Sequence, residues 1–343
     1  MILGRANSAK LAEPLRLGPV TIRNRVFLAP MSGITDLPFR ERAFAHGAGL
    51  VVSEMVASGE LAKGRGDTAR RIRRSDVAPH MVQLAGRDAS AMAEAARIAV
   101  AEGADVIDIN MGCPAKKVTG GYCGSALMRD LDHAAALIAA VVGAVGVPVT
   151  VKMRLGWDHD ALNAPELAVR AEGLGVGMLT VHGRTRCQFY QGQADWAAIA
   201  AVKQAVRIPV VANGDAGSIA DAALMLERSG ADAVMIGRAS CGAPWTAGQI
   251  AAQAAGLAST TVPADPDAIA GYVIAHYRDM LEFYGVESGL RQARKHLGWY
   301  LDRHAPDCPA PLRARILRSV EPGEVVEALS LAFADASLLK AAA

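Results

Sequence analysis

The sequence predicts an α/β fold, a (β/α)8 TIM barrel followed by a small all-helical C-terminal domain. Two observations predict the barrel: eight short apolar runs alternate with alanine-rich helical stretches, and no GxGxxG loop follows the first run. A third observation predicts the added domain, because the strand pattern stops at about residue 255. With 343 residues, the chain is long enough for both units.

The predicted strands are short and apolar, which is typical of parallel strands that are buried on both faces. They are Arg25–Pro30, Leu50–Ser53, Met81–Leu84, Val106–Asn110, Val149–Met153, Met178–Val181, Val210–Asn213 and Ala233–Ile236. Eight strands alternating with helices over about 250 residues favour a closed barrel.

Helical periodicity fills the segments between the strands. The predicted helices are Ala89–Glu102, Asp132–Val145, Ala164–Leu174, Asp195–Ala205 and Ser218–Arg228. The alternative fold is an open Rossmann-type sheet, whose first strand is followed by a glycine-rich phosphate loop. The stretch GLGVG at Gly173–Gly177 precedes a strand, so it is predicted to be a helix-to-strand turn.

The C-terminal part has no strand signal. Ser259–Pro266 is rich in Thr, Pro and Asp and is predicted to be a linker. Three helices are predicted after it, over Asp267–Tyr284, Gly289–Arg303 and Pro311–Lys340. We therefore predict a catalytic barrel domain over residues 1–255 and a helical domain over residues 265–343.

Composition excludes several classes of protein. Lys and Arg number 36 against 34 Asp and Glu, so the net charge of +2 does not indicate a nucleic-acid partner. Five cysteines without a CxxC pair favour neither a disulfide framework nor a zinc site, and we expect a protein of the reducing cytoplasm without a metal. Ala134–Val151 carries no charge before Lys152, but glycines and a proline interrupt it, so we expect no membrane association.

Polar residues follow the predicted strands at their carboxyl ends, where barrel enzymes place their active sites. The residues are Ser32 after strand 1, Gln83 at strand 3, Asn110 at strand 4, Lys152 and Arg154 at strand 5, His182 and Arg184 at strand 6, Asn213 and Asp215 at strand 7, and Arg238 after strand 8. Pro30 and Gly33 flank Ser32, where the backbone can lie against a flat ligand. These residues predict a polar site at one end of the barrel.

Gly214 and Gly237 follow the seventh and eighth strands, where barrels often bind a phosphate on backbone N–H groups. Arg238 adds a cation beside them; the alternative is a pair of ordinary strand-to-helix turns. Lys152 ends a buried strand and is either a base, a fixed cation facing an anionic ligand, or a surface lysine. Cys113 lies in a glycine-rich loop and is either a nucleophile or proton donor, or an inert core thiol.

Two stretches are locally basic. Lys63–Arg74 (KGRGDTARRIRR) has six basic residues against one acid, and Arg291, Arg294 and Lys295 share one helix face. Trp299 and Tyr300 follow the second stretch. Basic patches near aromatic residues suit a phosphate backbone with unstacked bases, although a solvated helix face is the alternative.

Taken in order, these strand ends resemble the bacterial tRNA-dihydrouridine synthases of the B type. The matching stretches are APMSGITDLPFR (29–40), GAGLVVSEMV (47–56), INMGCPAKKVTGGYCGSALMRD (109–130), VKMRLGWD (151–158), LTVHGRTRCQFYQGQADW (179–196), PVVANGD (209–215), ADAVMIGRA (231–239) and RQARKHLGWYL (291–301). They extend from the first strand into the helical domain, and together they are highly specific for this family.

The resemblance implies an FMN-binding barrel that uses NADPH (or NADH) to reduce the C5=C6 bond of uridines in the D-loop of tRNA. It assigns cofactor binding to Pro30, Met31, Ser32, Gln83, Lys152, His182, Asn213, Gly214, Asp215, Gly237 and Arg238. It assigns substrate binding to Asn110 and Arg184 at the uridine, and to Lys63, Arg65, Arg291, Arg294 and Lys295 on the tRNA.

The resemblance also makes Cys113 the proton donor to C5, opposite the hydride that reaches C6 from reduced flavin. Cys123, ten residues further along the same loop, leaves open which thiol acts. The B type suggests uridine 17 by analogy. We expect a monomer that binds tRNA; the alternatives are an FMN barrel acting on a small pyrimidine and a tRNA-binding protein without catalysis.

Overall fold

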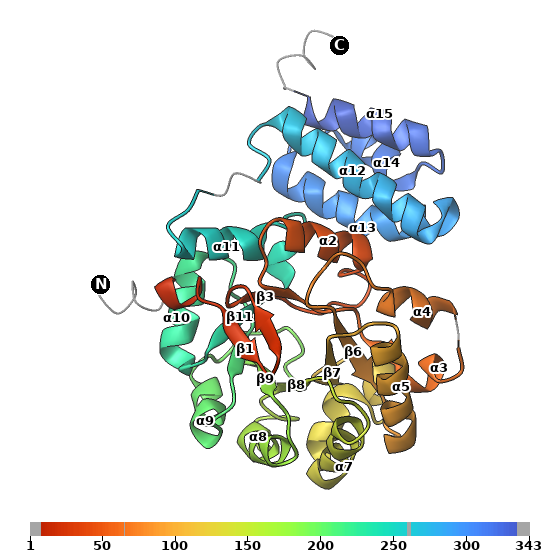
Figure 1. Ribbon diagram of the computed structural model, residues 1–343. Helices are drawn as coiled ribbons and strands as arrows, with labels where there is room; N and C mark the ends of the chain where they lie inside the picture. The colour runs from red at the N-terminus through yellow and green to blue at the C-terminus, as the bar shows by residue number, and fades with distance from the viewer. Residues whose placement is uncertain (1–7, 65, 259–261, 335–343) are drawn as a thin grey trace.

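A computed structural model describes residues 8–64, 66–258 and 262–334 of the chain. It shows a barrel of parallel strands surrounded by helices, with further helices stacked against one side (Figure 1). The predicted α/β barrel followed by a helical C-terminal region is confirmed.

Nine parallel strands form the barrel sheet in the order β4-β3-β11-β10-β9-β8-β7-β6-β5. They are β3 (Val26–Leu28), β4 (Leu50–Val51), β5 (Val56–Ala57), β6 (Met81–Ala85), β7 (Val106–Met111), β8 (Val149–Arg154), β9 (Met178–His182), β10 (Val210–Asn213) and β11 (Ala233–Ile236). A bridge between Val52 and Met81 closes the ring.

The second barrel strand is thus divided into β4 and β5, whereas the sequence predicted one run over Leu50–Ser53. The Ser53 hydroxyl accepts a hydrogen bond from the Gln83 amide at 2.9 Å, in place of a backbone carbonyl of the ladder. The chain leaves the regular ladder at this point and brings Met55 to the cavity described below.

Helices cover the outer face of the barrel: α2 (Leu37–Ala45), α3 (Ser58–Leu61), α4 (Gly66–Ile72), α5 (Ala89–Ala101), α7 (Leu131–Val142), α8 (Ala164–Gly173), α9 (Ala198–Ala205), α10 (Ile219–Ser229) and α11 (Thr246–Ala254). Short helical turns occur at α6 (Lys116–Thr119), η1 (Gly124–Arg129) and η2 (Arg238–Ser240). Asp88, Asp130 and Ser218 accept backbone N–H bonds at the starts of α5, α7 and α10, which satisfies donors that the helices leave free. The five helices predicted for the barrel are present, with ends shifted by up to three residues.

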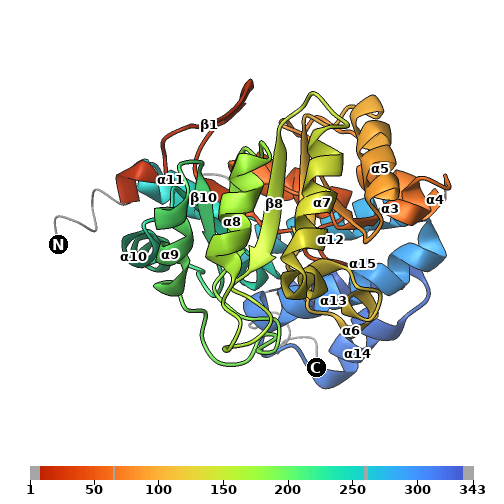
Figure 2. The same cartoon turned by 90° about the horizontal axis from the view of Figure 1, so that it is seen from below.

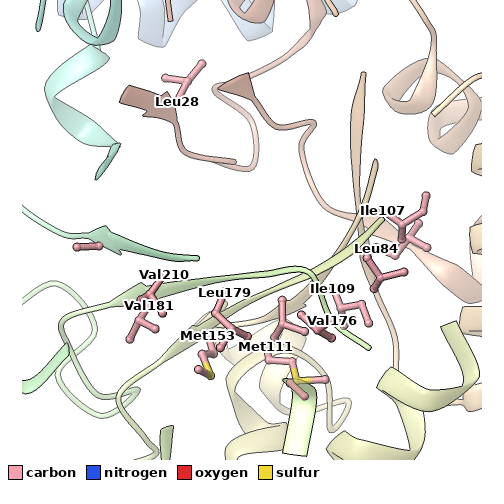
Figure 3. Close-up of a cluster of buried hydrophobic side chains, with 14 of the residues drawn as sticks. Leu28, Leu84, Ile107, Ile109, Met111, Met153, Val176, Leu179, Val181 and Val210 are labelled. Atoms are coloured by element: carbon pink, nitrogen blue, oxygen red, sulfur yellow. The ribbon is translucent and has the colours of Figure 1, made fainter. Parts of the chain in front are cut away.

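Apolar and polar residues alternate between the two faces of strands β7 and β8. Ile107, Ile109, Met111 and Met153 belong to the hydrophobic cluster between the strands and the outer helices (Figure 3). The residues between them are polar: Asp108 and Asn110 on β7, and Thr150, Lys152 and Arg154 on β8. Asp108 is paired in register with Thr150, and Asn110 with Lys152, so the barrel interior acquires polar layers.

A hairpin that the sequence analysis did not predict closes the amino end of the barrel. It consists of β1 (Leu15–Leu17) and β2 (Val20–Ile22). Leu15, Leu17 and Ile22 form a cluster with the first residues of the barrel strands, among them Val106 and Met178. The amino end is therefore packed with apolar side chains.

The helical region contains α12 (Pro266–Tyr284), α13 (Val286–His304), α14 (Ala310–Arg318) and α15 (Pro322–Phe333). The single helix predicted over Pro311–Lys340 is wrong, because the structure has two helices there; residues beyond 334 lie outside the described part. The break falls at Ser319–Glu321, where Pro322 disfavours a helical backbone for the residue before it. The Ser319 hydroxyl accepts the free Glu321 amide at 3.1 Å.

The helical region has a hydrophobic cluster of its own, which also includes Ala243 and Trp245 from the end of the barrel. It contacts α2 through an ion pair between Arg42 and Asp279 (2.6 Å) and a hydrogen bond between His46 and Tyr272 (2.9 Å). In the part of the chain that is described, no helix is both long and apolar enough to cross a membrane.

Candidate active site

A cavity of about 590 Å³ opens at the carboxyl ends of the barrel strands. Figure 2 shows β8 from the side, with its carboxyl end directed towards the part of the molecule that carries α6. Thirteen of the residues predicted from the sequence line this cavity: Pro30, Met31, Ser32, Gln83, Asn110, Cys113, Lys152, His182, Asn213, Gly214, Asp215, Gly237 and Arg238. They come from seven strand ends, and the closed barrel brings them together.

A chain of buried hydrogen bonds crosses the floor of the cavity. Asp108 accepts from the Thr150 hydroxyl and, at 2.7 Å, from Gln83 Nε2. Gln83 Oε1 in turn accepts from Asn110 Nδ2 at 2.8 Å. Burial raises the pKa of Asp108 to about 6, although the hydrogen bonds that Gln83 and Thr150 donate oppose the rise; its two carboxyl oxygens act as the acceptors of these bonds.

This chain fixes the orientation of two side-chain amides. Because Asp108 is an acceptor, Gln83 turns its NH2 group towards the carboxylate and its carbonyl towards Asn110. Asn110 therefore turns its own carbonyl oxygen towards the backbone amides of Gly112 (3.2 Å) and Cys113 (3.0 Å). The chain of hydrogen bonds that begins at Asp108 thus ends at the backbone amide of Cys113.

The backbone around Cys113 is held on every side. The Gly112 carbonyl accepts from Arg154 Nε at 2.9 Å, and the Cys113 carbonyl accepts from the Ser125 hydroxyl at 2.8 Å. Cys113 lines the cavity, whereas Cys123 does not; the Cys123 thiol donates to the Gly121 carbonyl at 3.4 Å. Burial raises the pKa of the Cys123 thiol. Of these two thiols, Cys113 is therefore the one that lies at the cavity.

Lys152 is a half-buried cation of the cavity. Its ammonium group donates to Asn213 Oδ1 at 3.1 Å, and Asn213 Nδ2 donates to the Met235 carbonyl at 2.8 Å. Burial, followed by the neighbouring Arg154, lowers the pKa of Lys152 to about 8. Burial and the surrounding cations also lower the pKa of His182 well below its ordinary value, so His182 is neutral at pH 7.

Asp215 is the carboxylate that balances two arginines. Both of its oxygens accept from Arg184, at 2.7 and 2.6 Å, and one accepts from Arg238 at 3.1 Å. Burial acts to raise the pKa of Asp215, but the hydrogen bonds from Arg184 and from the Ala194 amide outweigh it and lower the pKa. Arg238 remains half exposed at the cavity.

The structure gives Arg184 a place different from the predicted uridine contact. Its side chain is buried, does not line the cavity, and donates to Asp215 and to the carbonyls of Gln191 and Gly192. Arg184 therefore supports the cavity from behind, because it holds Asp215 and the loop after β9.

Gly214 and Gly237 form a backbone wall between the seventh and eighth strands. Gly214 has a φ of 126°, and a Cβ there would lie 2.6 Å from the Ala194 side chain. A Cβ on Gly237 would meet nothing nearer than Ala29 and Met31 at 3.9 Å, so this backbone faces open space in the cavity. The wall leaves room for a ligand group to approach the main chain.

The cavity is also lined by Arg154, which the sequence analysis placed at the end of strand 5 without a role, and by Phe189 and Tyr190, which it did not predict. Arg154 is almost fully buried and donates to the carbonyls of Gly112, Thr185 and Phe189. It lies two residues after Lys152 on the same face of β8. Phe189 and Tyr190 belong to the loop after β9, and nothing in their spacing distinguishes them.

The residues predicted to bind tRNA lie away from the cavity lining. Arg65 is outside the described residues, and Lys63 is exposed in the turn after α3. On α13, Arg291 pairs with Glu287 at 2.6 Å, Lys295 donates to Gln292 at 2.6 Å, and Arg294 is exposed. The Lys295 ammonium lies near Gly33, so α13 reaches the loop after β3 at the edge of the cavity.

The cavity has a surplus of positive charge, since Lys152, Arg154 and Arg238 face one carboxylate, Asp215, that is already paired. Such a site favours an anionic ligand. Among the described residues, no group of three His, Cys, Asp or Glu side chains is placed to hold a metal ion.

Comparison with known proteins identifies the family. The model of the dihydrouridine synthase (Dus) family matches residues 27–337. A probable tRNA-dihydrouridine synthase of Rhizobium leguminosarum bv. phaseoli is 56% identical over 310 residues, covering 90% of this chain and 95% of that protein. The tRNA-dihydrouridine synthase B of Xanthomonas campestris pv. campestris is 46% identical and covers 94% of this chain and 96% of its own length.

A solved structure of histamine dehydrogenase from Rhizobium sp. 4-9 has a TM-score of 0.57 with 15% identity. The match covers 77% of this chain and about half (51%) of that structure, and it shows similarity of fold alone. The family model and the close relatives together cover both the barrel and the helical region, so the chain belongs to the dihydrouridine synthase family.

Proposed function

We propose that this enzyme binds FMN in the barrel cavity and uses NADPH (or NADH) to reduce the C5=C6 bond of a uridine in the tRNA D-loop, with Cys113 as the proton donor. The proposal includes uridine 17 as the target and the cytoplasm as the place of reaction. One observation carries it: a thiol on a fixed backbone and a cationic, glycine-walled pocket share one cavity.

The residues of the cavity fit FMN. The backbone wall at Gly214 and Gly237, with Arg238 beside it, suits a terminal phosphate, because main-chain N–H groups and a guanidinium both bind phosphate oxygens. Lys152 suits the edge of the ring system on which negative charge collects during reduction, and Gln83 has oriented amide groups for the polar edge. When bound, FMN supplies hydride to C6 of the uracil.

Cys113 completes the reaction by transferring its thiol proton to C5. The Cys113 amide donates to Asn110, while Arg154 and Ser125 donate to the carbonyls of Gly112 and Cys113; these bonds hold the backbone on both sides of the thiol, which reduces the cost of positioning it. Asn110 also lines the cavity and has an amide N–H available for a carbonyl oxygen of the base. This side chain therefore links recognition of the base with placement of the acid.

The target uridine has to leave its stack to enter a cavity of this depth, as in other enzymes that modify a base. The RNA on either side must then bind to the surface around the opening. Arg294 and Lys295 on α13 and the exposed Lys63 are the proposed contacts, together with Arg65, which is proposed from the sequence alone. Arg291 contributes less to the proposal because Glu287 already neutralises it.

The test is mass spectrometry of tRNA transcribed without modifications, after incubation with the purified protein, FMN and NADPH. We expect dihydrouridine at one D-loop position. Turnover of a free pyrimidine without tRNA would instead support a small-molecule dehydrogenase. A protein that binds tRNA but neither binds FMN nor forms product would be a binding protein without catalysis. Product at another D-loop position would change the target but not the chemistry.

A further inference from the structure

The opening of the cavity has two opposite sides. The loop after β3 meets the helical region, as the contact between Gly33 and Lys295 shows. Counting β4 and β5 as one position, β8 lies four positions from β3 in either direction around the closed barrel. Figure 1 agrees, since the helical region packs near α2 whereas α7 and α8 lie on the far side. We call the far side, formed by residues 116–133, 157 and 186, the lid rim.

A ladder of cations and aromatic rings leads outward from the cavity along the lid rim. The Arg186 guanidinium lies 4.7 Å from the ring centre of Phe189, which lines the cavity, and 4.6 Å from that of Trp157. The Arg129 guanidinium lies 4.9 Å from the centre of the same Trp157 ring. The order is therefore Phe189, Arg186, Trp157, Arg129.

The ladder ends at a second hollow of about 260 Å³, which is lined by Tyr122, Ala126, Leu127, Arg129, Asp130 and His133. Tyr122 is 66% exposed, although an aromatic ring gains by burial. Its backbone has a φ of 56°, a left-handed conformation that is uncommon for a bulky residue. The loop thus holds an aromatic ring in solvent at the edge of a hollow.

The cations of the lid rim are not neutralised. Within the described residues, none of Lys116, Lys117, Arg129 and Arg186 forms an ion pair, and the buried Nε of Arg186 has no hydrogen-bond partner. Asp130 also lines the hollow; it accepts the His133 amide and, within the described residues, forms no ion pair with Arg129. On the helical side, Arg291 is paired and Lys295 is hydrogen-bonded, whereas Arg294 is exposed.

We propose that the lid rim is a binding site for single-stranded RNA, in which a nucleotide next to the reacting uridine places its base against Tyr122 in the hollow and its phosphate on Arg129. The inference rests on the proposed function, because the strand enters from the cavity. Unstacked bases bind to aromatic rings and to arginine planes, and phosphates bind to unpaired cations. The ladder provides both along one path.

The test measures the dissociation constant of unmodified tRNA at several salt concentrations for wild type, Arg129→Gln, Tyr122→Ala and Tyr122→Phe. We expect Arg129→Gln to weaken binding about three- to tenfold and to reduce the slope of log Kd against log salt by about one. Tyr122→Ala weakens binding at least about fivefold with an unchanged slope, and Tyr122→Phe restores it, because stacking needs a ring and no charge.

Arg207→Gln is the matched control, since Arg207 is an exposed arginine before β10, at the amino end of the barrel. It should leave both the dissociation constant and the slope unchanged. Ultraviolet cross-linking of the wild-type complex adds a readout that requires no variant: the peptide carrying Tyr122 should be attached to RNA.

The inference is overturned if wild type forms dihydrouridine while Arg129→Gln and Tyr122→Ala bind tRNA as wild type does, or if cross-links fall on the helical region alone. Failure of the proposed function gives a different result. In that case wild type forms no dihydrouridine, whatever the variants do to tRNA binding.

Discussion

The cavity and the contact between α2 and the helical region both contain buried histidines and arginines. They differ in whether the polar atoms of these side chains have hydrogen-bond partners. In the cavity, Lys152 and Arg154 have hydrogen-bond partners and face open space. At the contact with the helical region, both ring nitrogens of His296 and one nitrogen of His276 have no partner among the described residues. Phe39 and Tyr300 pack around these rings.

A cluster of titratable side chains is therefore not by itself a sign of function. What distinguishes the cavity is that its polar groups are oriented by neighbours and still leave donors for a ligand. Substitutions in the cavity should reduce activity and leave stability nearly unchanged. Substitutions at the helical contact should change stability and leave the chemistry intact.

The largest expected effect is that of Cys113→Ala, which should lower the rate of dihydrouridine formation about 10²- to 10⁴-fold, the usual value of a positioned acid. Its control is Cys123→Ala on the same loop, which should retain most of the activity because Cys123 does not line the cavity. Both variants should melt within a few degrees of wild type. If Cys123→Ala lost more activity than Cys113→Ala, then Cys123 would be the proton donor.

The second prediction concerns the buried chain below Cys113. In Asp108→Leu, the NH2 group of Gln83 has no acceptor, so the side-chain amides of Gln83 and Asn110 lose their fixed orientation. We therefore expect kcat to fall about 10- to 100-fold. Asp108→Asn should recover most of it, because its carbonyl accepts from Gln83 and its NH2 donates to the Thr150 hydroxyl.

The reaction of Cys113 with iodoacetamide distinguishes positioning from a general structural role. In Asp108→Leu the alkylation rate of Cys113 should change, and in Asp108→Asn it should match wild type. If Asp108→Leu alters stability but neither the alkylation rate nor kcat, then Asp108 is part of the core and does not position the thiol.

The third prediction is a pH dependence of FMN binding. Burial and Arg154 lower the pKa of Lys152 to about 8 in the free protein, and an anionic ligand raises it again. Binding therefore takes up a proton above pH 8, and the dissociation constant of FMN should rise about tenfold from about pH 7 to about pH 9. Fluorescence quenching measures it, and Lys152→Met should remove the dependence. The same dependence in Lys152→Met would assign it to another group.

The sequence predicted the cavity better than its surroundings, for a physical reason. In a closed parallel barrel all carboxyl ends meet, so residues such as Gln83 and Asn213 are brought together by topology alone. The backbone hydrogen bonds that place Arg184 behind Asp215 depend on the path of the loop after β9, which no periodicity describes. The same is true of the ladder through Trp157.

The prediction of basic surface patches counted the charged residues of a stretch without knowing their ion-pair and hydrogen-bond partners. The run at Lys63–Arg74 appeared as one basic patch, but Arg71 donates to the Met55 carbonyl beside the cavity, while Arg74 bonds to Asp105 and Gly103 at the start of β7. Basic residues of this one stretch thus bind to two separate parts of the barrel. Pairing between residues distant in sequence decides which cations stay free, and only the fold reveals it.

The smallest expected effect lies at the helical contact, in His296→Leu. The substitution replaces a buried ring whose two nitrogens lack partners with an apolar side chain, so the free energy of unfolding at about pH 7.5 should rise by about 1 kcal/mol. Activity should stay at the wild-type level, because His296 does not line the cavity. Urea unfolding measures the first quantity, and dihydrouridine formation the second.

The sign of the pH effect separates this explanation from a gain in packing alone. Burial, and then Lys295, lower the pKa of His296 to about 3, so between about pH 3 and pH 6.5 the unfolded chain binds a proton there that the folded protein does not. Wild-type stability therefore falls as the pH drops through this window. In His296→Leu the slope should decrease by about 1.4 kcal/mol per pH unit near pH 5. An unchanged slope would mean that the imidazole is protonated in the folded protein, and the contrast between the two regions would be lost.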